Sequence, residues 1–355
     1  MNHHTTYAVD LAKSVFEIAV SNHPGHVCER HRLSRERFLT FFAQQKTGTV
    51  LLEACGSAHH WARSLSSIGH NVVLLPPHRV RPYVTGNKTD SADAKALLEA
   101  VRNQDIRPVP VKSIDQQSLA ALHRLRSAWI SARTARINTV RGLLRELGVF
   151  IPRGAKRVRP ALAELLEDPD SPLPHALRPA LADAADEIAL LERRLADLQT
   201  QLNALGRSIP DVHLLQTILG IGPITATALV ACVGNVQRFP SGRHFASYLG
   251  LTPREHSSGL TRRLGAISKR GDTYIRMLLV HGARSVLWSA KRNTNPDPIQ
   301  LWALEIERTR GHNKAAVALA NKLARIIWAV WKNQRPYERR STSSIPPHTT
   351  PTTDC

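Results

Sequence analysis

The sequence predicts an α/β amino-terminal domain, then a helical coiled-coil connector and a mostly helical carboxy-terminal domain. Short apolar runs between turn-forming segments indicate the first domain, and apolar residues three and four apart indicate the helices that follow. The chain has 355 residues and is 42% hydrophobic, which is enough to form more than one core. We expect domains at residues 1–110, 111–207 and 208–335, with a disordered Ser-, Thr- and Pro-rich tail at 336–355.

The first domain is predicted from five apolar runs, the first two of which are spaced like a β-hairpin. Strands are expected at residues 7–9, 15–20, 27–33, 50–53 and 72–75. Helices are expected between them at residues 35–44 and 57–67.

Four acidic residues stand where a metal-dependent nuclease core would need them. Asp10 and Glu53 each end a buried apolar run. Asp90 and Asp93 are three residues apart, so they share one face if residues 94–101 are helical. Carboxylates gathered in so basic a chain predict Mg²⁺ bound beside a phosphate backbone.

Charge points to a polyanionic partner. Lys and Arg number 48 against 28 Asp and Glu, a formal net charge of +20. No apolar run approaches the length of a membrane span, and the amino terminus lacks the apolar region of a signal peptide, so nucleic acid is favoured over a membrane. The four cysteines form no CxxC pair, which favours neither a zinc site nor a disulfide framework and fits a cytoplasmic protein.

The connector is predicted to contain long helices. Residues 115–147 have the pattern of one long helix or two, and another helix is expected after the Pro-rich segment 169–174. The second helix has an apolar heptad seam, formed by Ile188, Leu191, Leu195, Leu198, Leu202 and Leu205. This seam is typical of a coiled coil, either a helical hairpin packed on itself or a pairing with another subunit.

A basic stripe lies between residues 122 and 160, where Glu146 is the single acid. A merely solvated helix face usually mixes signs, so the stripe favours a track for nucleic-acid phosphates. Its basic residues are Arg124, Arg126, Arg133, Arg136, Arg141, Arg145, Arg153, Lys156, Arg157 and Arg159.

Two further segments are predicted to be turns or loops that could contact a phosphate. Residues 219–225 resemble the turn of a helix-hairpin-helix, where glycines let backbone N–H groups approach a phosphate, although a tight turn between core helices explains them equally. Ser258 precedes Gly259 in a basic loop and could attack a phosphodiester, but a loop serine is more often a turn or cap residue. The loop's basic residues are Arg254, Arg262, Arg263, Lys269 and Arg270.

Three acidic segments, residues 9–13, 52–56 and 88–94, resemble the motifs of the DEDD transposases of insertion-sequence family one-ten, more closely its eleven-eleven subgroup. Relatives of that family include the Piv/MooV DNA invertases and bridge-RNA-guided recombinases. The likeness covers almost the whole chain except the tail. It implies a RuvC/RNase H-like first domain with Asp10, Glu53, Asp90 and Asp93 as catalytic residues and Mg²⁺ ligands. Residues 220–272 resemble the family's carboxy-terminal Tnp domain.

By motif match, the family's serine nucleophile falls on Ser258, directly before Gly259. Many relatives have a second glycine where this chain has Leu260. The resemblance also implies a site-specific recombinase guided by a noncoding bridge RNA that pairs with target and donor DNA. Its subunits would form dimers that pair into tetramers, with the acidic site of one subunit meeting the serine of another.

Three functions compete. A Mg²⁺-dependent serine recombinase accounts for the acids, the basic stripe and the serine loop together. A structure-selective RuvC-type junction nuclease accounts for the acids and charge but leaves Ser258 idle, because it attacks with water. A noncatalytic nucleic-acid scaffold accounts for the charge alone. Substitution of Ser258 separates the first two, and substitution of Asp10 separates both from the scaffold.

Overall fold

The computed structural model describes residues 5–23, 26–85, 87, 89–259 and 261–338. The chain forms two compact units, residues 1–113 and 114–355. The helices expected as a connector therefore belong to the second unit. Residues 339–355, most of the predicted tail, lie outside the described part of the chain.

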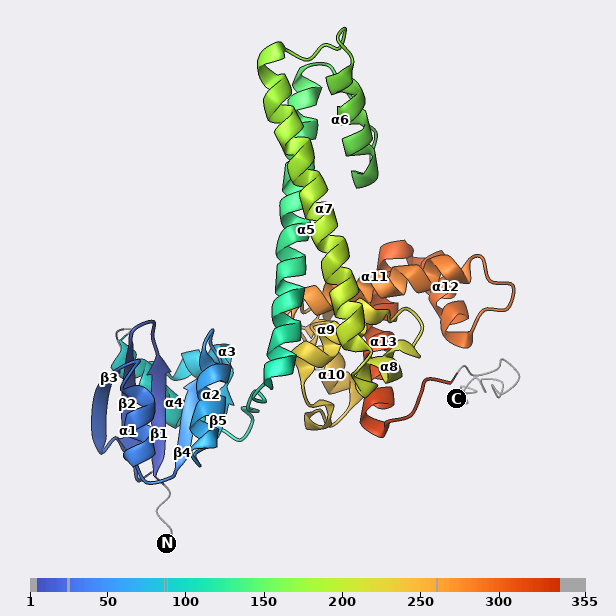
Figure 1. Ribbon diagram of the computed structural model, residues 1–355. Coiled ribbons are helices and arrows are strands. Elements are labelled where there is room, and N and C mark those ends of the chain that lie inside the picture. The colour runs from blue at the N-terminus through green and yellow to red at the C-terminus, as the bar shows by residue number, and fades with distance from the viewer. Residues whose placement is uncertain (1–4, 24–25, 86, 88, 260, 339–355) are drawn as a thin grey trace, which may run out of the picture. The chain divides into compact units, whose positions relative to one another are not determined.

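The first unit, called here the sheet unit, is built on five strands in the order β3-β2-β1-β4-β5 (Figure 1). The first three strands form an antiparallel meander, and β4 and β5 extend the sheet in parallel from β1. The strands are β1 (Thr6–Leu11), β2 (Val15–Ser21), β3 (Glu29–Ser34), β4 (Thr49–Glu53) and β5 (Asn71–Leu75).

Each face of this sheet has its own apolar core. One face includes Val9 and Phe16 and packs against α1 (Phe38–Gln44) and α2 (Ala58–Ser67). The opposite face includes Ala8, Ala19 and Leu51 and packs against α4 (Asp90–Ala100). The unit also contains α3 (Pro77–Val80) and the short 3₁₀ helix η1 (Arg81–Tyr83).

The predicted mixed α/β region followed by a helical region is confirmed. All five strands form close to the expected residues, although β3 begins two residues later than predicted. The helix expected from residue 35 begins at Phe38, where the first large apolar side chain enters the core.

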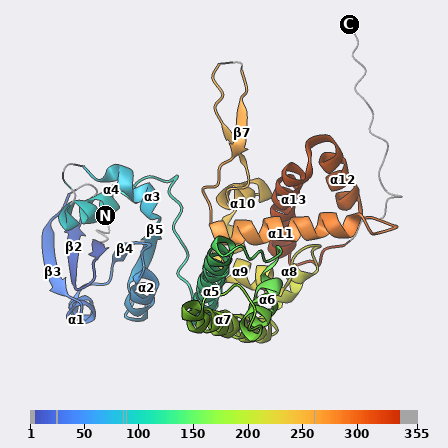
Figure 2. The same ribbon diagram turned by 90° about the horizontal axis from the view of Figure 1, so that it is seen from above.

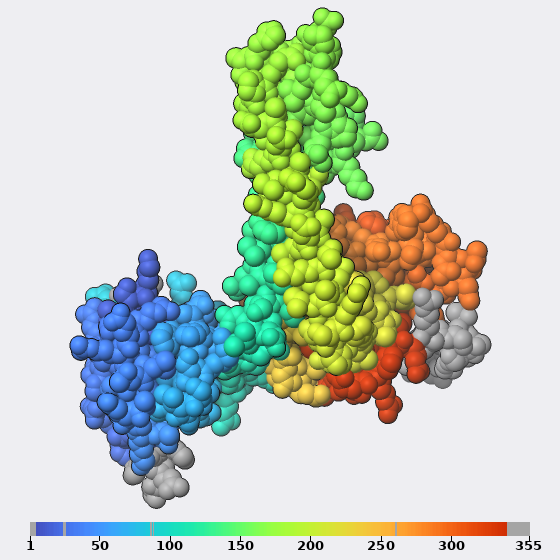
Figure 3. Space-filling view, in the orientation of Figure 1, coloured from blue at the N-terminus to red at the C-terminus, as the bar shows by residue number. Residues whose placement is uncertain are grey.

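The second unit, called here the helical unit, contains a long helical hairpin. Residues 114–146 form the single helix α5 (Ile114–Glu146), which packs along α7 (Arg178–Gly206). The short α6 (Val158–Glu167) packs against α7, and the side chains of α5 and α7 form one continuous column (Figure 3). Two 3₁₀ turns, η2 (Ala155–Arg157) and η3 (His175–Leu177), flank α6.

The heptad seam of α7 is covered within the chain. Ile188 packs in a cluster with α5 residues, and Leu198 and Leu202 pack in a second cluster that includes Leu119. Leu202 is completely buried, whereas Leu205 is 40% exposed. The seam of residues 188–205 therefore packs within the chain as a helical hairpin, which is the first of the two alternatives, and pairing with another subunit is not needed to explain its apolar stripe.

The rest of the helical unit is a globular body around the buried helix α13 (His312–Asn333). Its core includes Phe245, Leu279 and Leu323 from different helices. The body contains α8 (Pro210–Gln216), α9 (Pro223–Val233), η4 (Val236–Arg238), α10 (Gly242–Tyr248), α11 (Thr273–Ala290), α12 (Pro298–Arg310) and α13 (His312–Asn333). Among the described residues, no helix combines the length and the apolar character needed to cross a membrane.

A β-hairpin projects from this body and was not predicted. Strands β6 (Pro253–Glu255) and β7 (Leu264–Ile267) pair antiparallel within the segment interpreted as a basic loop, and they stand out from the helices in Figure 2. Every described residue from 253 to 266 is exposed. The polar, charged sequence conceals the strands because neither hairpin face enters a core.

Candidate active site and nucleic-acid contacts

Two of the predicted acids lie at the carboxyl ends of adjacent parallel strands. The register of β1 with β4 pairs Val9 with Leu52, so Asp10 and Glu53 follow one residue further along. Side chains alternate between faces of a strand, and Ala8 and Leu51 face α4. Asp10 and Glu53 therefore lie on the α4 face as well, and both are half-buried.

The other two acids belong to the first turn of α4. The Thr89 hydroxyl caps this helix by accepting a hydrogen bond from the Ala92 N–H at 3.2 Å. Asp90 is exposed and Asp93 is half-buried, and both are favoured by the positive end of the helix dipole. Lys88, which begins this motif in the sequence, lies outside the described residues.

The fold thus brings all four acids to one face of one sheet. They do not form a closed ligand set: within the described ranges, no group of three or more His, Cys, Asp or Glu side chains is arranged to hold a metal ion. Carboxylate oxygens are nevertheless the donors that Mg²⁺ prefers, so the residue types fit that ion.

A fifth acid, Glu17, joins this face and was missed in the sequence. It pairs with Asp10 across β1 and β2 and is half-buried. With Asp90 it lines a pocket of about 420 Å³. Its only sequence signal is a lone acid inside the apolar run of residues 15–20, which could not be distinguished from a solvent-facing residue.

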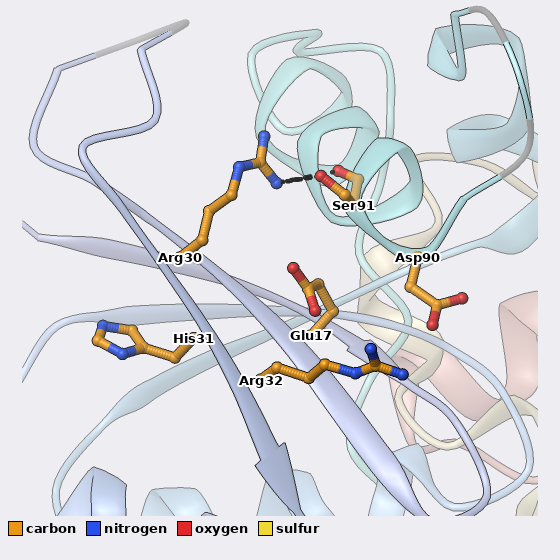
Figure 4. A pocket seen from close by; sticks show the side chains of 6 residues that line it. All are labelled: Glu17, Arg30, His31, Arg32, Asp90 and Ser91. Atoms are coloured by element: carbon orange, nitrogen blue, oxygen red, sulfur yellow. Dashed lines mark hydrogen bonds between the residues drawn. The ribbon is translucent and has the colours of Figure 1, made fainter.

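Arginines from the edge strand β3 complete this pocket. Arg30 donates to the hydroxyl of Ser91 at the start of α4, and Arg30 and Arg32 both line the pocket with Glu17 and Asp90 (Figure 4). His31 also borders it, but its ring contacts Phe41 on the other side of the strand. A cation pair therefore stands beside the acidic face, where a nucleic-acid phosphate could lie.

Ser258 lies at the tip of the β6–β7 hairpin. It exchanges two backbone hydrogen bonds with Thr261, at 3.3 and 3.1 Å, which join the two arms of the hairpin. Gly259 in this turn has φ +56°, a left-handed conformation that favours glycine. Leu260, the departure from the family pattern, lies outside the described residues.

The hydroxyls of the two adjacent serines differ. Ser257 Oγ donates to Glu255 at 2.8 Å and accepts from the Arg263 N–H at 3.2 Å. This bond to Ser257 is the main cause that lowers the pKa of the Glu255 carboxyl. Ser258 Oγ makes no hydrogen bond with any described residue. Ser257 therefore stabilises the hairpin, whereas the described residues leave the Ser258 hydroxyl without a hydrogen bond.

Close backbone contacts hold the base of the hairpin. A Cβ on Gly271 would lie 2.2 Å from the Tyr248 carbonyl oxygen, and one on Gly250 would lie 2.8 Å from the Arg270 nitrogen. The buried Arg276 donates to the carbonyls of Leu249 at 3.2 Å and Gly271 at 3.1 Å. The tip is exposed, but its attachment to the body is tightly packed.

The basic residues of the hairpin are divided between internal bonds and solvent. Arg262 pairs with Glu255 at 3.2 Å, and Arg254 donates to the Ser268 carbonyl at 3.4 Å. Exposed side chains without a hydrogen bond or ion pair to any described residue are those of Arg263, Lys269 and Arg270. Those three are the most available for a phosphate near Ser258.

A buried polar cluster joins α5 to the start of α11. His123 Nδ1 lies 3.1 Å from the Tyr274 hydroxyl, and its Nε2 lies 3.1 Å from the Thr227 hydroxyl. Burial, helped by the nearby Arg126 charge, lowers the pKa of His123 to about 4. The imidazole is therefore neutral at pH 7 and serves to connect helices.

The basic stripe divides into structural and solvent-facing residues. Four of its arginines make internal bonds: Arg126 with Tyr274, Arg136 with Glu187, Arg141 with Pro152 and Gly154, and Arg159 with Glu192. Arg133 is half-buried. The exposed members whose side chains make no hydrogen bond or ion pair with a described residue are Arg124, Arg145, Arg153, Lys156 and Arg157. The sequence could not separate the two groups because their partners lie elsewhere in the chain.

The glycine turn of residues 219–225 has a packing role. Gly220 has φ +80°, and a Cβ there would lie 2.7 Å from the carbonyl oxygen of Gly282 in α11. The left-handed glycine therefore allows the turn between α8 and α9 to contact α11 closely. This is the alternative of a tight turn between core helices, and a phosphate is not needed to explain it.

Comparison with known proteins decides the family. Residues 212–296 match the family described as "Transposase IS116/IS110/IS902 family", and residues 7–149 match the DEDD transposase family of the IS110 type. A probable family 20 transposase of Pseudomonas aeruginosa is 44% identical over 93% of this chain and 97% of its own length. The chain belongs to the IS110/IS116/IS902 family of transposases. The expected enzyme class is thereby confirmed, since transposases carry out DNA strand transfer.

Other relatives of this transposase have similar coverage. The transposase of insertion sequence element IS1111A from Coxiella burnetii is 38% identical over 93% of this chain and 90% of its own length. A putative transposase of Sinorhizobium fredii is 36% identical over 93% of this chain and 85% of its own length. DNA is therefore a partner, and the DEDD domain suggests a divalent metal.

Proposed function

We propose that this transposase is an RNA-guided, site-specific recombinase that cuts and rejoins DNA through the acids of the sheet unit and Ser258 of the helical unit. Placement of the four acids on one sheet face carries the proposal. The Ser258 hydroxyl, which has no hydrogen bond to the described part of the chain and lies at the tip of a basic hairpin, supplies the second component. The basic surface of a chain with charge +20 supports binding of both nucleic acids.

The acids are proposed to hold Mg²⁺, and the sheet is proposed to be of the RuvC/RNase H-like type. A strand order with three antiparallel strands followed by two parallel ones supports this label. Asp10, Glu53, Asp90 and Asp93 would be the ligands. When bound, the ion would neutralise charge on phosphate oxygens. The acids are proposed to approach one another when their mutual repulsion is removed.

Ser258 is proposed to attack the scissile phosphate. Its Oγ forms a bond to phosphorus, the bond to the 3′ oxygen breaks, and the serine proton is passed to that oxygen, which leaves as a hydroxyl. The DNA 5′ phosphate remains on the serine, and attack by a 3′ hydroxyl reverses the step without external energy. Arg263, Lys269 and Arg270 would stabilise the added negative charge.

The guide is proposed to be a noncoding bridge RNA. Its phosphates would bind the exposed members of the basic stripe, from Arg124 to Arg157. The test is to purify the chain from cells that contain the complete element and sequence the bound RNA. A single transcript encoded by the element is expected. Bound RNA with the same composition as total cellular RNA would contradict the proposal of a guide RNA.

Assembly as dimers that pair into tetramers is also proposed, with the acids of one subunit acting beside Ser258 of another. Complementation tests this arrangement. Chains with Asp10→Asn and with Ser258→Ala are each expected to be inactive, but their coexpression should restore part of the excision of a marked element. Failure of coexpression, with both chains folded and assembled, would indicate that one subunit supplies both groups.

Metal dependence tests the acidic site. Strand cleavage by the full chain should require Mg²⁺ and stop when the ion is removed by a chelator. Binding of the same DNA without cleavage should persist, because the arginines make those contacts. Equal cleavage with and without the metal would exclude the acids as its ligands.

A further inference from the structure

An aromatic side chain lies exposed in the basic stripe, at the end of α5. Phe150 is 73% exposed, the largest exposed fraction among the bulky apolar side chains of the described residues. It lines a pocket of about 450 Å³ together with Asn138, Arg145 and Arg153. Between residues 138 and 157 the sequence has five basic residues and one acid.

The loop that carries Phe150 is fixed against α5. Gly148, with φ +76°, ends the helix, and its N–H donates to the Arg145 carbonyl at 3.0 Å. Arg141 then donates to the carbonyls of Pro152 at 2.7 Å and Gly154 at 3.0 Å. Ile151, adjacent to Phe150, is buried. The phenyl ring is therefore held in solvent by its neighbours, which anchor the backbone on both sides.

We propose that this pocket binds one unpaired nucleotide, with its base stacked on Phe150 and its flanking phosphates on Arg145 and Arg153. Stacking on an aromatic ring needs an exposed base face, which an unpaired base has and a base inside a duplex does not. The pocket volume is within the range of small-molecule sites. Asn138, at the side of the pocket, offers an amide that can hydrogen-bond to a base edge.

Charge argues against an apolar protein partner as the occupant. A second protein surface over Phe150 would also cover Arg145 and Arg153, and it would need acidic residues to compensate their lost hydration. A nucleotide supplies a ring for the phenyl group and phosphates for the arginines in one ligand. The assignment rests on the proposed nucleic-acid function, but not on Ser258 or the acidic site.

The test is binding by the full chain of fluorescent 20-nucleotide oligothymidine, oligouridine and a DNA duplex of equal length. Phe150→Ala should weaken single-strand binding roughly 5- to 150-fold, the range for one base stacked on an aromatic ring. Duplex binding should change less than about twofold, because phosphate contacts dominate it. The stronger of the two single-strand effects identifies whether RNA or DNA occupies the pocket.

Matched variants separate stacking from simple apolar contact. Phe150→Leu keeps apolar surface without a ring and should lose about as much as alanine, whereas Phe150→Trp should bind like the parent. Leu143→Ala, at a 48% exposed position on α5 outside the pocket, should have no effect. Arg145→Ala and Arg153→Ala should each reduce the single-strand salt slope by about 0.7.

Three results would overturn the proposal. These are parent-like single-strand binding by Phe150→Leu, equal losses for duplex and single strand, and a smaller assembly in light scattering of Phe150→Ala with binding intact. The last result would identify an interface between subunits. Asp10→Asn and Ser258→Ala chains should bind oligonucleotides normally, so failure of the catalytic proposal remains distinguishable from failure of this one.

Discussion

The acids of the sheet unit and the serine of the helical unit are supported in opposite ways. Asp10 and Glu53 continue strands whose preceding residues are completely buried. Ser258 is at the tip of an exposed hairpin whose base is held by Gly250, Gly271 and Arg276.

This contrast indicates a division of tasks. In the proposed mechanism, core strands and a capped helix turn would hold the acids in a fixed frame, and the Ser258 hydroxyl would reach a phosphate that is positioned by other groups. Substitutions at the acids should therefore remove chemistry and leave folding intact. Substitutions of Gly250, Gly271 or Arg276, at the base of the hairpin, should mainly lower the free energy of unfolding.

Asp10→Asn should produce the largest loss of transposase activity. Because a neutral amide cannot replace the carboxylate that is proposed to bind Mg²⁺, excision of a marked element in cells should fall by on the order of 1000-fold. The purified protein should unfold at the parent temperature. Asp105→Asn, at an exposed acid of the same unit, is the matched control and should retain activity. Excision by Asp10→Asn at the parent level would show that the Asp10 carboxylate is not needed for strand cleavage.

Leu202→Glu should cause the largest loss of stability in the helical unit. It places a carboxylate at a completely buried position between α7 and its neighbours, so the free energy of unfolding should fall by about 4 kcal/mol. Leu205→Glu, three residues away and 40% exposed, should cost less than about 1 kcal/mol. Urea unfolding measures both. Equal costs would show that the seam is not buried in the monomer.

Stability of the helical unit should also depend on pH through His123. Its pKa is about 4 in the folded chain and about 6.5 when unfolded, so the unfolded state binds more protons between these values. The contribution of His123 to the free energy of unfolding is therefore fully present above pH 6.5, and up to about 3 kcal/mol of it is lost as the pH falls to 4. His123→Gln should remove this component. An unchanged pH profile in that variant would mean that His123 is not buried in its neutral form.

Arg276→Met should have a smaller effect. The buried guanidinium satisfies carbonyls of Leu249 and Gly271, and its loss should lower the free energy of unfolding by about 2 kcal/mol. Arg270→Met, at an exposed neighbour, should change it by less than about 0.5 kcal/mol. Calorimetry compares the two. Identical melting of both variants would contradict the anchoring role.

The sequence predicted the elements whose patterns are local. Apolar runs at 50–53 and 72–75 become β4 and β5, and the periodicity of residues 115–147 becomes α5. The positions of Asp10 and Glu53 at strand ends were also visible, because each follows an apolar run directly.

The rest depends on contacts between distant residues. Nothing local shows that Glu17 pairs with Asp10, that Arg276 is buried, or that Arg136 pairs with Glu187 while Arg145 faces solvent. The β6–β7 hairpin was missed for another reason. Both of its faces are exposed, so the alternation that indicates a half-buried strand is absent.

Trapping of a covalent intermediate tests the central claim most directly. A nicked DNA that carries the element end, with a radioactive phosphate at the cleavage position, should leave its label on the protein. Digestion should place this label on Ser258, Ser257→Ala should still form the adduct, and Ser258→Ala should form none. Label on Ser257, or cleavage by Ser258→Ala with release of a free 5′ phosphate, would contradict the account and favour a hydrolytic nuclease.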